Sequence, residues 1–503
     1  MKHEKLSNAL NEISNKYLEE AAHTRKQKPS HWLGAVAAIL ALAVLIGAVC
    51  HPLLFPGDEI TLSGPDTTQP TVPPFDYNPF HGTMTPAEIA PSASAYLLAA
   101  PSYPKMAPYS TQNYNGWWNS QKAIHATTEG YADSLTGYWK ALTPAVLTRG
   151  EENAVFSPLN VYLALAMLAE TSQGNSRQQI LSLLDADSIE ALRVQADQVW
   201  RAHYNNDGLS TSILGSSLWL DDSISYDEST VQTLTKRYYA SVFQGQMGSA
   251  ELNSALQDWL NANTGGLLQK QAANAQLSPE DILALATTIY YQVQWQNDFN
   301  EAANTQGVFY SPSGEQPVTF MNKKLTYGPY YWGEDFGAVR LNLENGDDLW
   351  LILPDEDKSP ADILASGHAM DMVLTSGSYE NETVITVNLS VPKFDISADL
   401  DLKDALQTLG VTDIFDVYRA DLSAILPGAA ERAIRPHVSS IDHAVRVAIN
   451  EKGVTAAAFT WIPAAGAAPP PETEINFVLD RPFLFVVESR DGLPVFAGIV
   501  NTP

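Results

Sequence analysis

The chain has 503 residues, 45% of them hydrophobic, which is enough for one large domain or several average domains with buried cores. Its 29 basic residues stand against 57 acidic ones, a balance that argues against nucleic acid and anionic lipid as partners of the globular part. A single cysteine, Cys50, excludes a disulfide framework and a thiolate metal site. The patterns His-Glu-x-x-His, Gly-x-Ser-x-Gly and the phosphate loop are absent from the sequence, so the common hydrolase and nucleotide-binding classes are not indicated. We expect no metal and no organic cofactor.

An uncharged stretch near the N-terminus predicts a transmembrane helix at residues 32–51. Residues 32–50 are nineteen consecutive positions without a charge, long enough at ~1.5 Å per residue to cross a ~30 Å hydrocarbon core. Three basic residues precede the stretch and two acidic residues follow it, namely Arg25, Lys26, Lys28, Asp58 and Glu59. The positive-inside rule then places residues 1–31 in the cytoplasm and the rest outside the cell. There are two alternatives to a membrane helix: a cleaved signal peptide, which would give a secreted protein, and a buried core helix. Acylation of Cys50 is a further possibility.

A linker and a folded domain follow this stretch. Residues 52–112 are rich in Pro, Thr and Ser, as in SGPDTTQPTVPPFDYNPF, and without periodicity they predict an extracellular, semi-extended linker. Residues 113–503 show the patterns of a folded domain. Ser157 followed by Pro158 predicts the start of a helix that ends near Gly174, and 213–220 and 350–353 read as strands. Helices come mostly first and strands mostly later, which indicates an α+β fold.

Six segments, in the same order along the chain, resemble the serpin family of serine protease inhibitors. They are NAVFSPLNVYLALAMLAETSQGNSRQQIL (153–181), LQDWLNANTGGLL (256–268), ATTIYYQVQW (286–295), VPKFDI with DLKDALQTLGVTDIF (391–415), ADLSAI (420–425) and RPFLFVV (481–487). The resemblance implies a large central, mostly antiparallel sheet A, further sheets B and C, about eight to nine helices and an exposed reactive-centre loop. With its N-terminal helix the chain resembles a bacterial, membrane-anchored member of the family.

The resemblance places the reactive-centre loop at about residues 451–474. EKGVTAAAFT is similar to the family hinge pattern Glu-x-Gly-Thr-x-Ala-Ala-Ala-Ala, which assigns hinge roles to Glu451, Gly453, Val454, Thr455, Ala456, Ala457 and Ala458. Val454 stands where threonine or serine is usual, and Phe459 replaces a residue that is usually small. The family mechanism implies that a protease attacks the loop as a substrate, after which the loop inserts into the sheet as a new central strand.

The residues of the loop meet the physical requirement for insertion. A strand that enters a finished sheet must present small or apolar side chains to the core at every second position. Counting from Val454, that face carries Ala456, Ala458, Thr460, Ile462 and Ala464, none of them charged, while both aromatic residues share the opposite face. Pro463 lacks an amide and would leave one ladder hydrogen bond unmade. From composition alone, a flexible Ala/Pro linker or an edge hairpin is an equal alternative.

Family spacing places the scissile bond fourteen residues beyond Gly453, between Ala467 and Ala468, to within one or two residues. An alanine before the cleaved bond fits a small apolar pocket, as in elastase-like or subtilisin-like serine proteases, and argues against trypsin-like ones. The chain would then be an inhibitor and not an enzyme, because the nucleophile is the serine of the protease.

The resemblance also implies a buried polar cluster, the shutter, which governs opening of the sheet. Its members here are Ser157, Asn160, Thr287 and His443, and Trp295 matches the breach position near the top of the sheet. Thr287 stands where the family has asparagine, and Asn160 where serine is common, so the amide is expected to have moved across the cluster. Ordinary buried polar residues are the alternative interpretation of the four, and Trp295 is more safely read as a core residue than as a functional one.

Three functions follow from this sequence. The first is a membrane-tethered, monomeric inhibitor of elastase-like serine proteases that does not bind nucleic acid. The second is a non-inhibitory serpin that acts as a surface binding protein or a plain protease substrate, which Val454, Phe459 and Pro463 would support. The third is a secreted hydrolase, for which no nucleophile and base are visible.

Overall fold

The structure is a computed structural model of the chain, and it describes residues 91–148, 150, 152–266, 268–375, 379–428, 435–439, 441–454, 471 and 473–503. The expected cytoplasmic segment, the expected membrane helix with Cys50, and the linker up to residue 90 lie outside these residues. Within the described part of the chain, none of the helices combines the length and the apolarity that crossing a bilayer requires.

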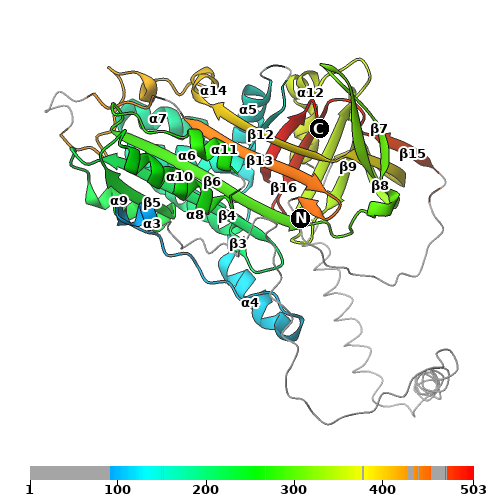
Figure 1. Ribbon diagram of the computed structural model, residues 1–503, viewed down its shortest axis with the longest axis horizontal. Helices are drawn as coiled ribbons and strands as arrows, with labels where there is room; N and C mark the ends of the chain where they lie inside the picture. The colour runs from blue at the N-terminus through cyan, green and yellow to red at the C-terminus, as the bar shows by residue number, and fades with distance from the viewer. Residues whose placement is uncertain are drawn as a thin grey trace, which may run out of the picture. The chain divides into compact units, whose positions relative to one another are not determined.

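The first sheet has eight strands and forms the centre of the fold (Figure 1). Its order is β1-β5-β4-β6-β14-β13-β12, with β3 paired to β4. The strands are β1 Leu97–Ala99, β3 Asn205–Asn206, β4 Thr211–Asp221, β5 Ala240–Gly245, β6 Leu283–Gln294, β12 Phe394–Asp401, β13 Asp442–Asn450 and β14 Gly453–Val454. Every pair is antiparallel except β4 with β5, in agreement with the mostly antiparallel central sheet that was expected.

The second sheet has nine strands in the order β15-β11-β8-β9-β10-β16-β17-β2, with β7 paired to β8. The strands are β2 Ala154–Phe156, β7 Thr305–Ser311, β8 Gly314–Trp332, β9 Phe336–Asn342, β10 Asp348–Pro354, β11 Glu382–Pro392, β15 Glu474–Val478, β16 Phe483–Glu488 and β17 Pro494–Val500. The nineteen-residue β8 pairs with β7 and β11 over most of its length and with β9 at its end. The expected separate sheets B and C are therefore one continuous sheet here, because this long strand belongs to both.

The α-helices run from α3 to α14 in the described residues, more than the eight to nine expected. They are α3 Pro91–Ser94, α4 Tyr114–Ile124, α5 Thr136–Leu147, α6 Pro158–Thr171, α7 Gly174–Leu183, α8 Ile189–His203, α9 Glu228–Arg237, α10 Ala250–Asn263, α11 Gln269–Asn274, α12 Pro360–Ser366, α13 His368–Leu374 and α14 Lys403–Thr408. The count is higher because several are short: α3 has four residues, and α11 and α14 have six each.

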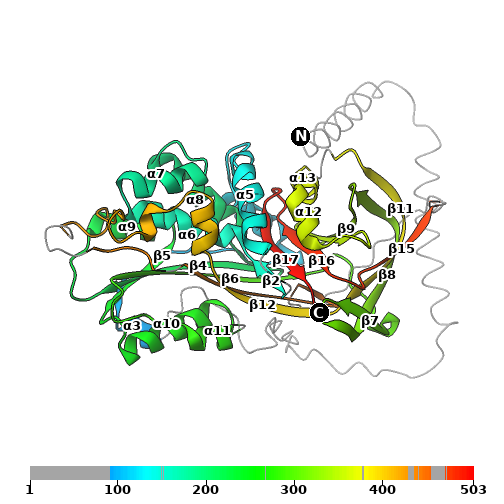
Figure 2. The same cartoon turned by 90° about the horizontal axis from the view of Figure 1, so that it is seen from above.

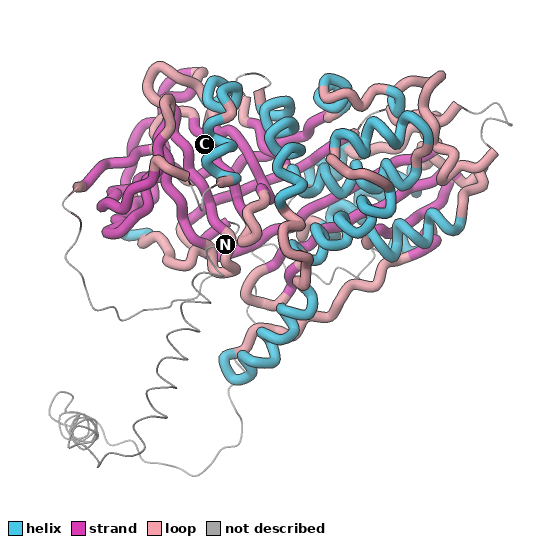
Figure 3. The backbone as a smooth tube through the Cα atoms, turned by 180° about the vertical axis from the view of Figure 1, so that it is seen from behind, coloured by secondary structure: helices cyan, strands magenta, loops and turns pink. Residues whose placement is uncertain are grey.

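Helices cover both faces of the first sheet. Figure 2 shows α6, α7, α8 and α9 on one face and α3, α10 and α11 on the other, and the view from behind in Figure 3 shows most of the helices gathered over this sheet. Strand β4 is consequently buried at every position from Ser212 to Leu220, since side chains on both of its faces meet helices. One apolar core surrounds α6, and a second, smaller core lies between the sheet and α10.

Local signals in the sequence explain where α6 begins but not where it ends. Ser157 is its N-cap, with Oγ accepting from the backbone N–H of Asn160 at 3.2 Å, and Pro158 is its first residue, as predicted. The predicted end at Gly174 is wrong, because α6 stops at Thr171 and Gly174 begins α7 with a φ of +55°. The Arg177 guanidinium donates to the carbonyls of Ala169 and Glu170, which lie in the last turn of α6. These carbonyls therefore need no further helical turn to supply their hydrogen bonds, and the helix can end at Thr171.

The N-terminal side of the domain extends further than the sequence indicates. The sequence places residues 91–112 in the linker, whereas the structure gives α3 and β1 in this stretch, with β1 paired to β5 as the edge strand of the first sheet. Tyr103 stacks its ring on those of Trp200, Tyr204 and Tyr239 at centroid distances of 5.5, 5.8 and 6.3 Å. These side chains are contributed by distant parts of the chain, so no local periodicity could reveal the contact.

Candidate functional site

The candidate site is the place where β14 enters the first sheet. Strand β13 ends at Asn450, the chain turns at Glu451 and Lys452, and β14 then runs back between β13 and β6. Gly453 lies opposite Gln294 and Asn450, and Val454 lies opposite Val293 and Ile449.

The side chain of Val454 is 1% exposed, and its packing explains why an apolar residue fits there. Its strand partners Val293 and Ile449 are 1% and 2% exposed, so the three apolar side chains share one face of the sheet in the core. Full burial of a valine stabilises by about 1.5–3 kcal/mol, and threonine at this position would bury a hydroxyl group as well. Val454 therefore holds the start of the loop in the sheet.

Gly453 is required by the close approach of β14 to β6. Its φ is +153°, and a Cβ atom built on it would lie 2.3 Å from the carbonyl oxygen of Val293 and 2.7 Å from Cα of Gln294. Since both contacts are with backbone, a side chain here would push the two strands apart.

Glu451 anchors the turn through buried charge. The residue is 5% exposed, its carboxylate accepts from Nδ2 of Asn304 at 2.5 Å, and Nζ of Lys393 lies 2.5 Å from the same oxygen. Burial alone would raise the pKa of Glu451, but the hydrogen bonds from Lys393 and Asn304 outweigh it and the pKa is lowered. The backbone carbonyl of Glu451 also accepts from the N–H of Phe299 at 3.0 Å.

Trp295 ties the end of β6 to the same turn. Its indole Nε1–H donates to the carbonyl of Asn450 at 2.8 Å, and its backbone N–H donates to the carbonyl of Lys452 at 3.0 Å. The side chain is 2% exposed and packs edge-to-face on Phe299 at 5.7 Å. The structure thus places Trp295 against the hinge, in contact with both sides of the turn.

Three of the four expected shutter residues lie together at the start of α6. The backbone N–H of Ser157 donates to Nε2 of His443 at 3.0 Å, and Ser157 also caps the helix through Asn160. His443 is 2% exposed, and burial lowers its pKa to about 4. Both polar atoms of the Asn160 side chain are buried without a hydrogen-bond partner among the described residues.

Thr287 stands apart from these three. It lies in β6 opposite Ser216 of β4, and no hydrogen bond joins it to Ser157, Asn160 or His443 in the described part of the chain. It instead lines a cavity of about 390 Å³, together with Ala444, the neighbour of His443 in β13.

The cavity lies between β6 and β13, beneath the short strand β14. Its walls come from α6 on one side, from α10 and α11 on the other, and from both strands. Its lining includes Leu168 of α6, Leu256 and Leu260 of α10, Ala286 and Thr288 of β6, and Ala444 of β13. The lower half of β6, from Leu283 to Thr287, is only partly buried, which agrees with an open space beside it.

The remaining predicted site residues lie outside the described part of the chain. They are Thr455, Ala456, Ala457 and Ala458 of the hinge and Ala467 and Ala468 of the reactive bond. The chain is described again at residue 471 and from residue 473, and β15 then pairs in parallel with β11 of the second sheet. The loop therefore starts in one sheet and ends in the other.

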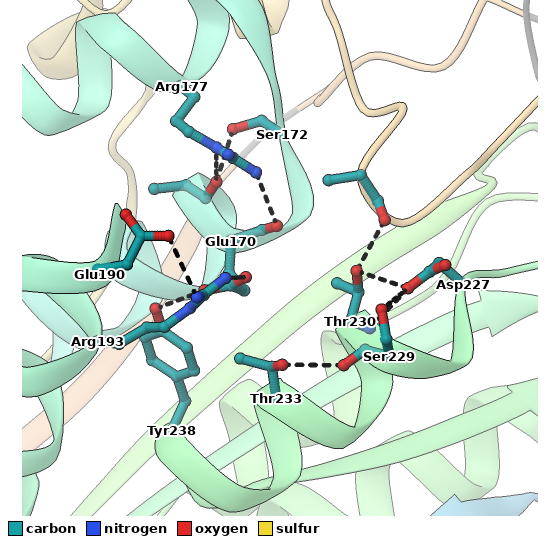
Figure 4. A network of polar contacts seen from close by, with 12 residues as sticks. Glu170, Ser172, Arg177, Glu190, Arg193, Asp227, Ser229, Thr230, Thr233 and Tyr238 are labelled. Carbon is teal, nitrogen blue, oxygen red and sulfur yellow. Dashed lines mark hydrogen bonds and ion pairs between the residues drawn. The ribbon is translucent and has the colours of Figure 1, made fainter. Parts of the chain in front are cut away.

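Sequence reasoning missed the partners that hold the hinge. Lys393 and Asn304 on Glu451, and Asp298 on Lys452 at 3.1 Å, come from segments that no motif marks. A second missed feature is the buried Glu170 at the end of α6, where Arg193 donates twice at 2.7 and 2.6 Å and the Tyr238 hydroxyl donates at 3.0 Å (Figure 4). Within the described residues, no cluster of three or more His, Cys, Asp or Glu side chains could hold a metal ion.

Comparisons with known proteins agree with this architecture. The family model described as "Serpin (serine protease inhibitor)" matches residues 141–503. Serpin-ZX of Arabidopsis thaliana is 28% identical over 371 residues, covering 70% of this chain and 92% of its own length. Plasminogen activator inhibitor 1 of Sus scrofa is 26% identical over 379 residues, covering 72% and 90%.

Solved structures show the same fold. The thermophilic serpin tengpin in its native state is similar with a TM-score of 0.66 and 23% identity, over 75% of this chain and 95% of that one. Arabidopsis AtSerpin1 in its native stressed conformation gives a TM-score of 0.65 and 24% identity, over 75% and 100%. Together with the family model, which covers more than half of the residues, these matches settle the family: the chain belongs to the serpins, the serine protease inhibitor family.

Proposed function

We propose that this serpin inhibits elastase-like or subtilisin-like serine proteases as a suicide substrate. The protease cleaves the loop near Ala467–Ala468, and the loop then enters the first sheet between β6 and β13 while it is still bound to the protease as an acyl-enzyme. The observation that carries the proposal is the position of β14: its two residues, Gly453 and Val454, already pair with β6 on one side and with β13 on the other.

The arrangement around β14 supports continued insertion. The N-terminal end of the loop is anchored by the buried Val454 and by the turn at Glu451, so residues after 454 would enter the sheet in a defined register. The cavity below β14 leaves room between β6 and β13 that a new strand would fill. A strand that completes the pairing of two neighbours gains their unsatisfied ladder hydrogen bonds and buries apolar surface.

Displacement of the protease supplies the inhibition. A strand rises ~3.3 Å per residue, so about fifteen inserted residues would carry the acyl-enzyme ~50 Å from its point of attack. Distortion that removes one oxyanion-hole donor alone slows a protease by about 10²–10³. The ester then outlasts normal turnover, and the serpin needs no catalytic group of its own.

A second candidate function is that of a non-inhibitory serpin, a surface binding protein or plain substrate. Pro463 favours it, because a proline in a central strand lacks the amide for one ladder hydrogen bond. This alternative predicts cleavage of the loop without a stable complex.

We further propose that the inhibitor is a monomer tethered to the cell membrane, of the bacterial membrane-anchored type. The uncharged residues 32–51 would cross the bilayer, and the linker up to residue 90 would hold the serpin domain outside the cell. The formal net charge of −28 supports the absence of nucleic acid among its partners. Protease accessibility of the domain on intact cells tests this placement.

The test of inhibition is to mix the chain with an elastase and, separately, with a subtilisin. We expect a band on denaturing gels near the summed mass of the two proteins, and a released peptide that begins around Ala468. Cleavage without that band would favour the non-inhibitory function. As a matched control, Ala467→Arg should move the complex from elastase to a trypsin-like protease while leaving the fold unchanged.

A further inference from the structure

Two carboxylates face each other in the second sheet. Asp348 of β10 lies directly opposite Glu488 of β16, and Asn342 of β9 lies opposite Asp348 on its other side. Residues that lie directly opposite one another share a face of the sheet, with Cβ atoms about 4.5–5.5 Å apart. A pair of like charges in this position is destabilising, so the arrangement needs a physical explanation.

Both carboxylates lie inside the protein. Glu488 is 5% exposed, and the side chain of Asp348 is 19% exposed. Trp350, two residues further along β10, is fully buried, and its indole Nε1–H donates to Oε2 of Glu488 at 2.5 Å. Water therefore solvates a charge on Glu488 poorly, and the indole hydrogen bond replaces only part of that solvation.

A third carboxylate adds negative charge. Asp347, in the turn before β10, is buried and accepts from the hydroxyl of Tyr291 at 2.7 Å and from the backbone N–H of Arg490 at 3.0 Å. His203 of α8 lines the same small cavity as Asp347. Tyr291 belongs to β6, so Asp347 links the second sheet to the first. A charge on Glu488 would repel Asp347 as well as its strand partner.

One cation stands against these three carboxylates. Nη1 of Arg340 lies 3.5 Å from Oδ2 of Asp348, and among the described residues no other basic side chain is within ion-pair distance of the three. The guanidinium also lies over the rings of Tyr331 and Trp350, at 5.9 and 5.4 Å from their centroids. The positive charge therefore pairs with Asp348, and Glu488 has no counter-ion of its own in the described part of the chain.

We propose that Glu488 keeps a proton in the folded protein up to neutral pH, and that loss of this proton in mild alkali weakens the pairing of β10 with β16. A neutral carboxyl removes the repulsion with Asp348 and can still accept the bond from Trp350. The proposal assigns a pH-sensitive contact to the second sheet, and it does not depend on the proposed inhibition of a protease.

The pKa of Glu488 agrees with this geometry. Burial raises it to about 7 from an ordinary 4.5, the bond from Trp350 lowers it, and the charge of Asp348 raises it. The folded protein thus binds this proton more tightly than the unfolded chain does. The stabilisation is fully present below pH 4.5 and is lost as the pH rises through 7.

The test compares urea unfolding of the full chain with that of Glu488→Gln between pH 6 and pH 9. Loss of the proton from Glu488 should raise the unfolding equilibrium constant by about tenfold over this range. The glutamine amide stays neutral and can accept the bond from Trp350, so the variant should lack this tenfold part. The buried histidines, whose pKa values are lowered, act with the opposite sign, but both chains contain them and their effect cancels in the comparison.

Two further variants sharpen the assignment. Glu382→Gln is the matched control, because Glu382 lies in the same sheet opposite Tyr331 and not opposite a second carboxylate. It should keep the pH dependence of the unchanged chain. Asp348→Asn removes the opposing charge and releases Arg340 to pair with Glu488, so the loss of stability should move to lower pH.

Infrared difference spectra between the unchanged chain and Glu488→Gln report the proton itself, because a carboxyl group and a carboxylate absorb at different frequencies. We expect the carboxyl signal at pH 6 and its loss by pH 9. An equal pH dependence of unfolding in both chains, or a carboxylate signal at pH 6, would overturn the proposal. So would a Glu488→Gln chain that fails to fold at pH 6, since a neutral amide should replace a neutral carboxyl there without leaving Trp350 unpaired.

Discussion

The backbone N–H of Ser157 donates to Nε2 of His443 across 3.0 Å, and this bond joins the N-terminus of α6 to the start of β13. An accepting Nε2 requires the neutral ring with its proton on Nδ1. Burial lowers the pKa of His443 to about 4, so the ring is neutral near pH 7. The link between helix and sheet thus depends on a ring that acid would charge.

Stability should fall in mild acid because of His443. Its pKa of about 4 in the folded protein lies below the ordinary 6.5, so the unfolded chain binds more protons between these values, and the stabilisation present above pH 6.5 is lost as the pH falls toward 4. The shift corresponds to about 3 kcal/mol. Urea unfolding at pH 7 and pH 5 measures the part that is lost in this range, about 2 kcal/mol.

The control for this prediction is His443→Gln, whose side-chain oxygen can accept the same bond. Burial also lowers the pKa of His125 and of His203, so part of the pH dependence should persist in the variant. An unchanged pH dependence would contradict the assignment to His443.

Gly453→Ala should expel β14 from the sheet. The added Cβ would meet the Val293 carbonyl at 2.3 Å, and overpacking against backbone costs about 1–3 kcal/mol. We expect a variant whose loop is cleaved normally but forms less complex with the protease, as measured on denaturing gels. Val194→Ala, in α8 and 59% exposed, should retain the complex. Full inhibition by Gly453→Ala would show that β14 need not start in the sheet.

Lys393→Ala should destabilise more than Glu451→Gln. The lysine variant leaves the buried Glu451 carboxylate without its ion pair, whereas the glutamine keeps a neutral group beside Asn304 and leaves only a partly exposed lysine unpaired. An uncompensated buried charge costs about 3–5 kcal/mol, and the 41% exposure of the Lys393 side chain places the effect at or below the lower end. Chemical denaturation measures the loss of unfolding free energy in each variant, and a larger loss in Glu451→Gln would contradict this prediction.

Asn160→Ser should stabilise the folded protein. Both polar atoms of the buried amide lack a partner among the described residues, and one unsatisfied buried group costs about 1–3 kcal/mol. A serine hydroxyl can bond to a carbonyl of its own helix, so a gain of about 1 kcal/mol is expected. Asn160→Ala, measured beside it, separates the lost volume from the lost amide. A loss of stability in both variants would indicate that the amide has a partner.

Much of the fold can be predicted from local sequence. Ser157–Pro158 predicts the start of α6 because a cap and a first-turn proline act within one turn, and the apolar runs at 213–220 and 350–353 lie inside β4 and β10. Family membership follows from six short segments that occur in the family's order, because each segment can be recognised from its own neighbouring residues.

The sequence was less informative where distant segments meet. The early end of α6 depends on Arg177, the joined second sheet depends on the length of β8, and the packing of Tyr103 depends on rings about a hundred or more residues away in sequence. Such contacts leave no periodicity in either partner, because each segment records only which of its faces is buried.

By itself, the sequence determined the α+β class and the family, since hydrophobic pattern, caps and motif spacing are properties of neighbouring residues. Only the tertiary structure decided that Val454 is buried between Val293 and Ile449, that Glu451 is paired with Lys393, and that a cavity lies below β14. The physical reason is that strand register, buried ion pairs and cavities are set by packing between segments far apart in the chain.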